Sequence, residues 1–157
     1  MPAEFLMTPN LEFVFELNAD LGPAIDLGPT PAGFRRIIDI VSGSFKGPLL
    51  RGVLLPGGAD WQIIRSDGVT ELHAHYILST DDAVLIQVNV HGLRHASGDA
   101  LARIEAGEIV DPREYYFRFA PIFQAPEGRY SWLNQSIFVG SGQRMQRAIS
   151  LKVFRVA

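Results

Sequence analysis

An alternation of apolar and polar residues, repeated along almost the whole chain, limits most strongly what this sequence can fold into. Alternation of period two places successive side chains on opposite faces of a β-strand. It is carried by residues 12–17, 34–41, 49–55, 60–65, 71–79, 83–91, 114–121, 130–139 and 147–156. The segment 97–107 instead has a helical pattern, with Ser97 or Asp99 as N-cap and Gly107 just beyond the end.

Turn residues separate these segments, and they predict how the strands connect. Ser66-Asp67-Gly68 is among the clearest turns, and Pro56-Gly57-Gly58 is expected to reverse the chain sharply. A flat sheet of so many strands would expose long unpaired edges. We therefore predict an all-β fold, a single antiparallel β-barrel of about nine or ten strands with one short helix. The absence of repeats and linkers predicts one domain over residues 1–157.

Composition excludes several classes of protein. Without cysteine the chain has no disulfide, thiolate metal site or cysteine nucleophile, which fits a reducing compartment, so we expect a cytoplasmic protein. Glu4, Pro9 and Glu12 interrupt the N-terminal apolar residues, and no run reaches the roughly 18 apolar residues of a membrane helix. We expect no membrane partner. A net charge of -3 disfavours nucleic acid. A homodimer or higher homo-oligomer is left open.

The polar faces of the predicted strands favour a small-molecule cavity. In residues 83–91 one face is apolar, while the other carries Gln87, Asn89 and His91. Residues 71–78 similarly place His73 and His75 on one face. A solvent face is normally rich in Lys and Glu, so these rows are expected to point inward and line a pocket. The alternative is that they face solvent around an apolar interior.

Three residues are candidates for catalysis. Asp60 follows a glycine pair and precedes Trp61, so burial would raise its pKa and make it a general acid or base. The alternative for Asp60 is a turn cap. His75 is a second candidate for moving a proton. Arg118 lies among aromatic residues and is expected to bind a carboxylate or enolate, or to pair with Asp60; the alternative is a structural salt bridge.

Six further residues are candidates for substrate binding, because ligand sites combine a few polar groups with aromatic side chains. They are Gln62, Asn89, His91, Tyr116, Trp132 and Asn134. His73 and His75 share a strand face and could form a metal pair with His91 or Glu71, but no third ligand has a diagnostic spacing. We therefore expect no metal and no cofactor.

Several motifs in the same order resemble one known family. They are Gly47-Pro48-Leu49-Leu50-Arg51-Gly52, Pro56-Gly57-Gly58-Ala59-Asp60-Trp61, Tyr115-Tyr116-Phe117-Arg118 and Tyr130-Ser131-Trp132-Leu133-Asn134. Together they resemble the domain of unknown function 3237 family over nearly the whole chain. The resemblance implies a small antiparallel β-barrel and supplies no established reaction. Asp60, Arg118, Trp132 and Asn134 stand at motif positions.

Two classes of function follow from these residues. One is a cofactor-free acid/base enzyme, an isomerase, lyase, hydratase or cyclase acting on an oxygenated cyclic or aromatic metabolite. Here Asp60 or a histidine moves a proton while Arg118 and Asn134 stabilise an oxyanion. The alternative is a non-catalytic barrel that binds a small acidic or aromatic ligand. A structural interaction module without a cavity is a third interpretation.

Overall fold

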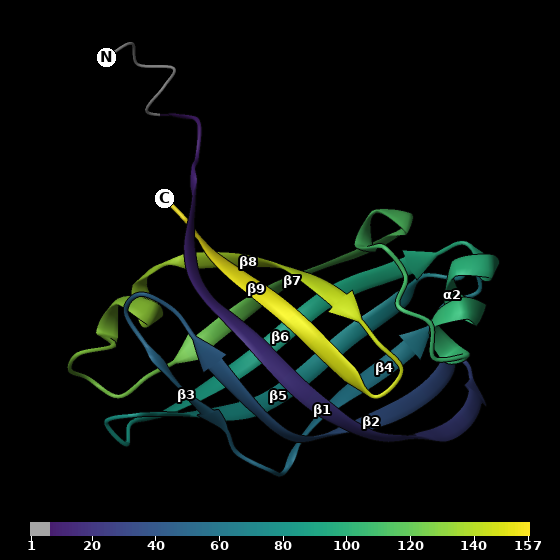
Figure 1. Cartoon of the computed structure of the whole chain (residues 1–157), viewed down its shortest axis with the longest axis horizontal. Helices are drawn as coiled ribbons and strands as arrows, with labels where there is room; N and C mark the ends of the chain where they lie inside the picture. The colour runs from purple at the N-terminus through teal and green to yellow at the C-terminus, as the bar shows by residue number, and fades with distance from the viewer. Residues whose placement is uncertain (1–6) are drawn as a thin grey trace.

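Nine antiparallel strands form one sheet that closes into a ring, with a short α-helix at one end (Figure 1). This computed structural model describes residues 7–157, so Glu4 lies outside the described residues. The strands are β1 (Leu11–Thr30), β2 (Gly33–Lys46), β3 (Arg51–Leu54), β4 (Gly58–Ile64), β5 (Thr70–Thr80), β6 (Leu85–Ala96), β7 (Tyr115–Gln124), β8 (Ile137–Arg144) and β9 (Ala148–Val156). The helical elements are α2 (Gly98–Glu105), η1 (Pro112–Glu114) and η2 (Ser131–Gln135). The predicted all-β barrel with one short helix is confirmed.

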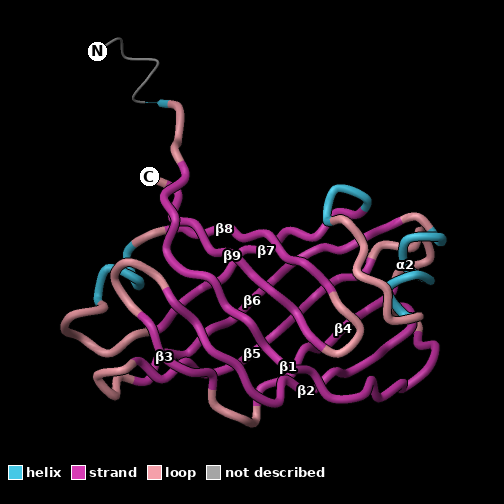
Figure 2. The backbone as a smooth tube through the Cα atoms, viewed as in Figure 1, coloured by secondary structure: helices cyan, strands magenta, loops and turns pink. Residues whose placement is uncertain are grey.

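The strand order explains how the ring closes. Neighbouring strands run β1-β9-β8-β7-β6-β5, and β5 pairs with both β3 and β4. Both of these strands also pair with β2, which returns to β1. The continuous ladder around the molecule leaves the helical elements at its two ends (Figure 2).

The prediction that Pro56-Gly57-Gly58 reverses the chain is wrong. β3 and β4 run in the same direction, because both pair antiparallel with β2, through Gly43↔Leu54 and Ile40↔Gly58. Between these pairs, the three residues 55–57 lie opposite the two residues 41–42. They therefore form a bulge, and β4 continues in the direction of β3 along β2. Gly57 has a φ of 102°, which bends the chain without turning it back. The Ser66-Asp67-Gly68 turn is confirmed, since Arg65 and Val69 close a hairpin there.

The first two strands extend far beyond their predicted limits. β1 and β2 pair as one long hairpin down to Thr30↔Gly33. Pro23 and Pro29, typical turn residues, fall within this hairpin, where register shifts after Asp20, Leu21 and Asp26 accommodate the irregular backbone. Bulges therefore allow a strand to continue through residues that the sequence pattern marks as turns.

Of the strand predicted over residues 130–139, only the last three residues lie in a strand, at the beginning of β8. Residues Ser131–Gln135 form the 3-10 helix η2, which lies at the end of the barrel away from α2 (Figure 1). The Tyr130 hydroxyl donates to Asp82 Oδ1 at 2.7 Å, and Thr80 Oγ1 donates to the same oxygen at 2.6 Å. Leu133 is fully buried beneath η2. These contacts close that end of the barrel.

Aromatic rings fill the half of the barrel next to η2. Phe15 packs edge-on against Phe45 and Phe123, with ring centroids 5.4 Å and 6.1 Å away, and Phe123 lies 4.9 Å from Phe138. Further along the inner face, Gly140 makes room for a ring, because a Cβ atom there would lie 2.1 Å from Phe119 Cζ. The core is therefore dense on this side.

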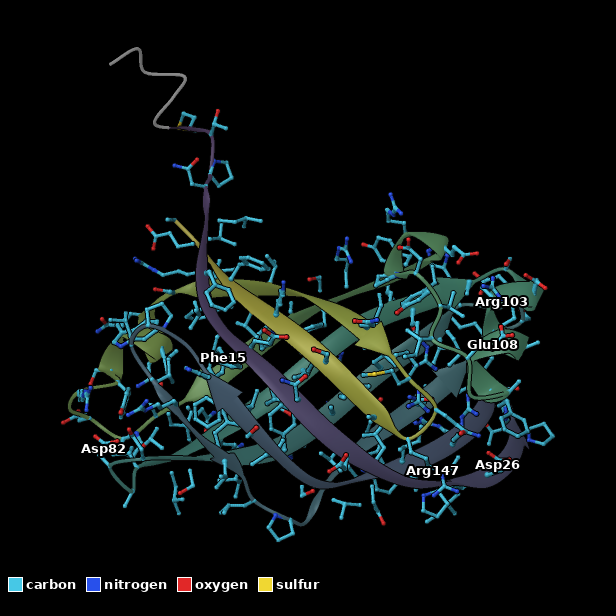
Figure 3. The ribbon with its side chains drawn as sticks, viewed as in Figure 1. Phe15, Asp26, Asp82, Arg103, Glu108 and Arg147 are labelled. Atoms are coloured by element: carbon cyan, nitrogen blue, oxygen red, sulfur yellow. The ribbon has the colours of Figure 1, made fainter. Side chains whose placement is uncertain are left out.

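The opposite end carries α2, which begins as predicted. Ser97 caps it by accepting a hydrogen bond from the Ala100 amide at 3.2 Å, and Ala100 and Ile104 are buried. Figure 3 shows Arg103, Glu108 and Arg147 at this end and Asp82 at the other. Within residues 7–157 no helix is long and apolar enough to cross a membrane.

Candidate functional site

A cluster of polar side chains lines the inner face of the barrel in its α2 half. β4 contributes Asp60 and Gln62, which lie beside Ile38 and Arg36 of β2 in the strand register. Arg94 comes from β6 and Arg144 from β8. Alternation along each strand places these residues in the same inward row as the apolar core. The barrel interior is therefore charged at one end and aromatic at the other.

Asp60 is held by two hydrogen bonds. Gln62 Nε2 donates to its Oδ2 at 2.8 Å, and the His73 backbone amide donates to its Oδ1 at 3.1 Å. Burial of the carboxyl group raises the pKa of Asp60, although these two donors and the charges of Arg94 and Arg144 act in the opposite direction. The predicted raised pKa is confirmed in direction. Its cause is the barrel interior and not Trp61, whose side chain points outward and is 49% exposed.

Gln62 is the most deeply buried polar residue of the cluster, with 1% of its surface exposed. Its amide nitrogen is occupied by Asp60, while its Oε1 has no hydrogen-bond partner among the described residues. A buried amide oxygen without a partner costs about 1–3 kcal/mol. Gln62 therefore presents an unused acceptor next to a carboxyl group.

Three arginines surround this pair of residues. Arg94 is 8% exposed, and burial, followed by the charge of Arg144, lowers its pKa to about 10. Burial and the charge of Arg36 likewise lower the pKa of Arg144. Arg144 is held by its own loop, since its Nη1 donates to the Met145 carbonyl at 2.6 Å. With a pKa of about 10, Arg94 keeps its positive charge at neutral pH.

Two adjoining chambers give access to these groups. The end chamber, about 290 Å³, lies between the β1–β2 hairpin and α2; its lining includes Arg36, Arg94, Tyr115 and Arg144. The inner chamber, about 40 Å³, is lined by Asp60, Gln62 and Tyr76 among apolar residues. Ile38, Arg94 and Arg144 line both chambers. A small molecule in the end chamber could therefore place one group beside Asp60.

The polar rows predicted to face inward lie on the outside of the barrel. His75 and His91 are exposed and Asn89 is half-buried, because Tyr76, Val88 and Val90 take the inward positions. The physical reason is alternation: in β5 and β6 the more apolar of the two rows forms the core, so the row that carries the histidines faces outward. The interpretation of these rows as the lining of an internal pocket is therefore wrong.

His91, Tyr116 and Arg118 instead line a groove on the side of the barrel, which we call the side groove. It has a volume of about 910 Å³ and also includes Trp61 and His73. His73 stacks on His91 with centroids 4.2 Å apart, and the Arg118 guanidinium lies 5.7 Å from the Tyr116 ring centre. Arg118 Nη1 donates to the Phe117 carbonyl and forms no ion pair with Asp60 within the described chain. The groove is wide and open to solvent.

Trp132 and Asn134 lie in η2, at the closed end of the barrel. Asn134 Oδ1 accepts from the Ala125 backbone amide at 2.8 Å, and its Nδ2 donates to the Ala125 carbonyl at 2.9 Å, so this side chain fixes a loop. Trp132 packs against Phe138 with centroids 6.2 Å apart. Of the residues predicted from the sequence, the structure thus brings Asp60 and Gln62 together in one cavity. It places the others elsewhere, and their predicted roles stay untested.

The arginines of the cavity were missed, although the pattern held a signal. Arg94 continues the inward row Ile86, Val88 and Val90 two residues beyond Gly92, and Arg36 precedes Ile38 in the same way. Arg94 and Arg36 therefore each stand at the next inward position of an apolar row, and alternation alone predicts that they face inward. Among residues 7–157, no three His, Asp or Glu side chains are placed to hold a metal ion.

Comparison with known proteins places the chain among relatives of the same fold. Residues 9–156 match the model of a family described as a protein of unknown function, DUF3237. A protein of Rhodopseudomonas palustris, named a UPF0311 protein, is 40% identical over 152 residues, which cover 96% of this chain and 99% of that protein.

Solved structures agree with the barrel. A crystal structure of a protein of unknown function from Rhodopseudomonas palustris has a TM-score of 0.91 at 38% identity, covering 96% of this chain and 99% of that one. A β-barrel-like protein of Acinetobacter baumannii has a TM-score of 0.83 at 39% identity, covering 96% and 97%.

More distant similarity leads to an enzyme. A hydroalkoxylation enzyme of Penicillium herquei is 32% identical over 80 residues, which are 51% of this chain and 53% of that protein. A solved structure of an enzyme from Penicillium herquei, with a TM-score of 0.71 at 24% identity and 95% of each chain covered, shares the fold.

Proposed function

The chain belongs to the DUF3237 family of proteins of unknown function, and we propose that this member is an acid/base enzyme whose reaction takes place at Asp60. The observation that carries the proposal is the position of that carboxyl group. It lies in a chamber within the barrel, has a raised pKa, and is next to a free amide oxygen and two guanidinium groups. A carboxyl group whose pKa is shifted toward neutrality can both give and take a proton.

The reaction class that this site supports best is addition to, or isomerisation of, an unsaturated oxygenated molecule. The distant relative whose name specifies hydroalkoxylation supports this class, because that reaction adds an O–H group across a C=C bond. In such a step the neutral Asp60 carboxyl donates its proton to one alkene carbon, while the substrate hydroxyl oxygen bonds to the other carbon. The hydroxyl proton then returns to the Asp60 carboxylate. The product is an isomer of the substrate, so no other reactant is consumed.

The surrounding groups suit the charges that this step creates. Proton donation leaves a negative charge on the Asp60 carboxylate, and Arg94 and Arg144, which line the same chamber, stabilise that charge until the hydroxyl proton returns. Tyr76 stays neutral, since burial and the nearby Asp60 raise its pKa, and it can donate a hydrogen bond. Gln62 orients the Asp60 carboxyl through its amide nitrogen. His75 and Arg118, on the outer face, take no part in this proposal.

The test compares the wild-type protein with Asp60→Asn in a metabolite extract, followed by mass spectrometry. The expected result is that wild type depletes one compound and produces another of equal mass, and that Asp60→Asn does neither. Asn keeps the size of the side chain and one acceptor oxygen but has no carboxyl proton to exchange. His75→Asn is the matched control on the outer face and should keep the activity.

The same experiment separates the alternative function. A compound that both wild type and Asp60→Asn bind and release unchanged would support a non-catalytic binding barrel. Equal conversion by both proteins would remove Asp60 from the reaction.

A further inference from the structure

The cavity contains more positive charge than the chain neutralises. Arg36, Arg94 and Arg144 line the end chamber, and the ionisable acids among the residues lining the two chambers are Asp60 and Glu105. None of the ion pairs found within residues 7–157 includes any of these three arginines. This local excess stands in a protein whose net charge is -3.

Unpaired charge at such depth is unfavourable for the fold. A buried ion must recover its lost hydration through a counter-charge and hydrogen bonds. The Arg94 side chain forms no hydrogen bond or ion pair within the described chain, and its guanidinium carbon lies 5.9 Å from the centre of the Phe117 ring. Each of Arg94 and Arg144 also feels repulsion from Arg36. A negatively charged molecule bound among these arginines would therefore be stabilised by charge that the chain itself leaves unpaired.

Two unsatisfied atoms specify this partner further. Arg36 Nε is a buried donor without an acceptor, and Gln62 Oε1 is a buried acceptor without a donor. Arg36 lines the end chamber and Gln62 the inner chamber, on paired positions of β2 and β4. A molecule that satisfies both must carry an oxygen acceptor and, a short distance away, a hydroxyl or similar donor.

We propose that the cavity binds a small organic oxyanion, a carboxylate, phenolate or enolate with a neighbouring hydroxyl and an apolar body. Its charged oxygen lies among Arg36, Arg94 and Arg144, and its hydroxyl donates to Gln62 Oε1. The apolar body lies against Pro23, Leu101 and Ile104, which line the end chamber. This inference names the ligand class of the proposed enzyme and rests on that proposal only in sharing its cavity.

The test uses a matched pair of probes, 2-hydroxybenzoate and 2-hydroxybenzamide, titrated into the protein by calorimetry at pH 7. They have nearly the same shape and the same hydroxyl, but only the first is an anion. We expect the acid to bind at least ten-fold more tightly than the amide. Arg94→Gln should lose that preference, and Arg36→Gln, which alters only the end chamber, should reduce it.

Arg113→Gln is the matched control, because it removes the same charge from an exposed position in η1, where Arg113 pairs with Asp111. It should leave both affinities unchanged. Circular dichroism verifies that each variant keeps the wild-type fold. Equal affinity for acid and amide, no binding of either, or an equal loss in Arg113→Gln would overturn the inference.

Asp60→Asn distinguishes this inference from the proposed reaction. This variant removes the carboxyl group that carries the proposed reaction and leaves all three arginines in place, so it should keep the preference for 2-hydroxybenzoate over 2-hydroxybenzamide. Preferential binding of the acid without any Asp60-dependent conversion in extracts would leave the ligand class standing and reject the enzyme. Asp60-dependent conversion together with no preference for the acid would do the reverse.

Discussion

Asp60 is a residue on which burial and hydrogen bonding act in opposite directions. Burial disfavours its charged form, while Gln62, the His73 amide and the nearby arginines favour it. Burial has the larger effect, so the pKa in the folded protein lies above the ordinary value of 3.8. The folded state therefore binds more protons than the unfolded state between 3.8 and the raised pKa.

Asp60→Asn is accordingly expected to leave the melting temperature at pH 7 equal to that of wild type or above it. In wild type, stability from this group is gained as pH falls through the raised pKa and is reduced as pH rises through it. Asn lacks this dependence, so the advantage of the variant should shrink to nothing as the pH approaches the ordinary carboxyl pKa of 3.8. Thermal melts across this pH range provide the measurement. A large loss of stability at pH 7 would make Asp60 a structural residue.

Among the elements, α2 determines how the cavity is covered. Its residues Leu101, Ile104 and Glu105 line the end chamber, and its first turn depends on the Ser97 side chain. An eight-residue helix has little stability of its own, so its cap contributes noticeably.

Ser97→Ala should lower the free energy of unfolding by about 1 kcal/mol, because the Ala100 amide loses its acceptor. Hydrogen exchange should become faster in residues 98–106 and stay unchanged in β5 and β6, which are held by the ladder. Denaturant unfolding and exchange mass spectrometry measure the two effects. Faster exchange throughout the barrel would show that α2 is part of the cooperative core.

Prediction from the sequence succeeds for elements whose signal is local. The Ser97 cap, the Ser66-Asp67-Gly68 turn and the period-two strands depend on neighbouring residues, and all three are present. Pro56-Gly57-Gly58 looks like a reversal in sequence, but whether β3 and β4 fold back or continue depends on their shared partner β2. The facing of His75 and His91 also needed tertiary information, since alternation defines two faces without stating which is inside.

For the site, the sequence identified Asp60 and Gln62 but not the arginines beside them. Asp60 follows a recognisable glycine pair, whereas Arg36, Arg94 and Arg144 belong to three strands that meet only when the ring is closed. Arg118 is predicted to bind an anion because aromatic residues flank it in the sequence. In the structure those neighbours alternate between the core and the surface, which leaves Arg118 outside.

At the scale of the whole molecule, the interior is divided into a dense aromatic half and a polar half with chambers. The Phe119 ring, which lines the inner chamber, fills the space that a side chain at Gly140 would need. Overpacking of such a position typically costs about 1–3 kcal/mol.

Gly140→Ala should therefore lower the free energy of unfolding by about 2 kcal/mol or more, because Phe119 must move. Gly98→Ala is the matched control: its added methyl group meets nothing within 4 Å, and α2 favours alanine. It should be neutral or stabilising. Urea unfolding of both variants gives the comparison, and similar results for the two would show that the inner face is loosely packed.

This division of the interior has a consequence for how the protein can be altered. The rings around Phe15 and the Asp82–Tyr130 contact secure the fold at one end, while the hairpin, α2 and the 144–147 turn surround the cavity at the other. A mutagenesis library restricted to the second set changes the walls of the cavity and leaves the aromatic contacts at the closed end in place. Diversity can therefore be introduced at one end of the barrel while the other end is held constant.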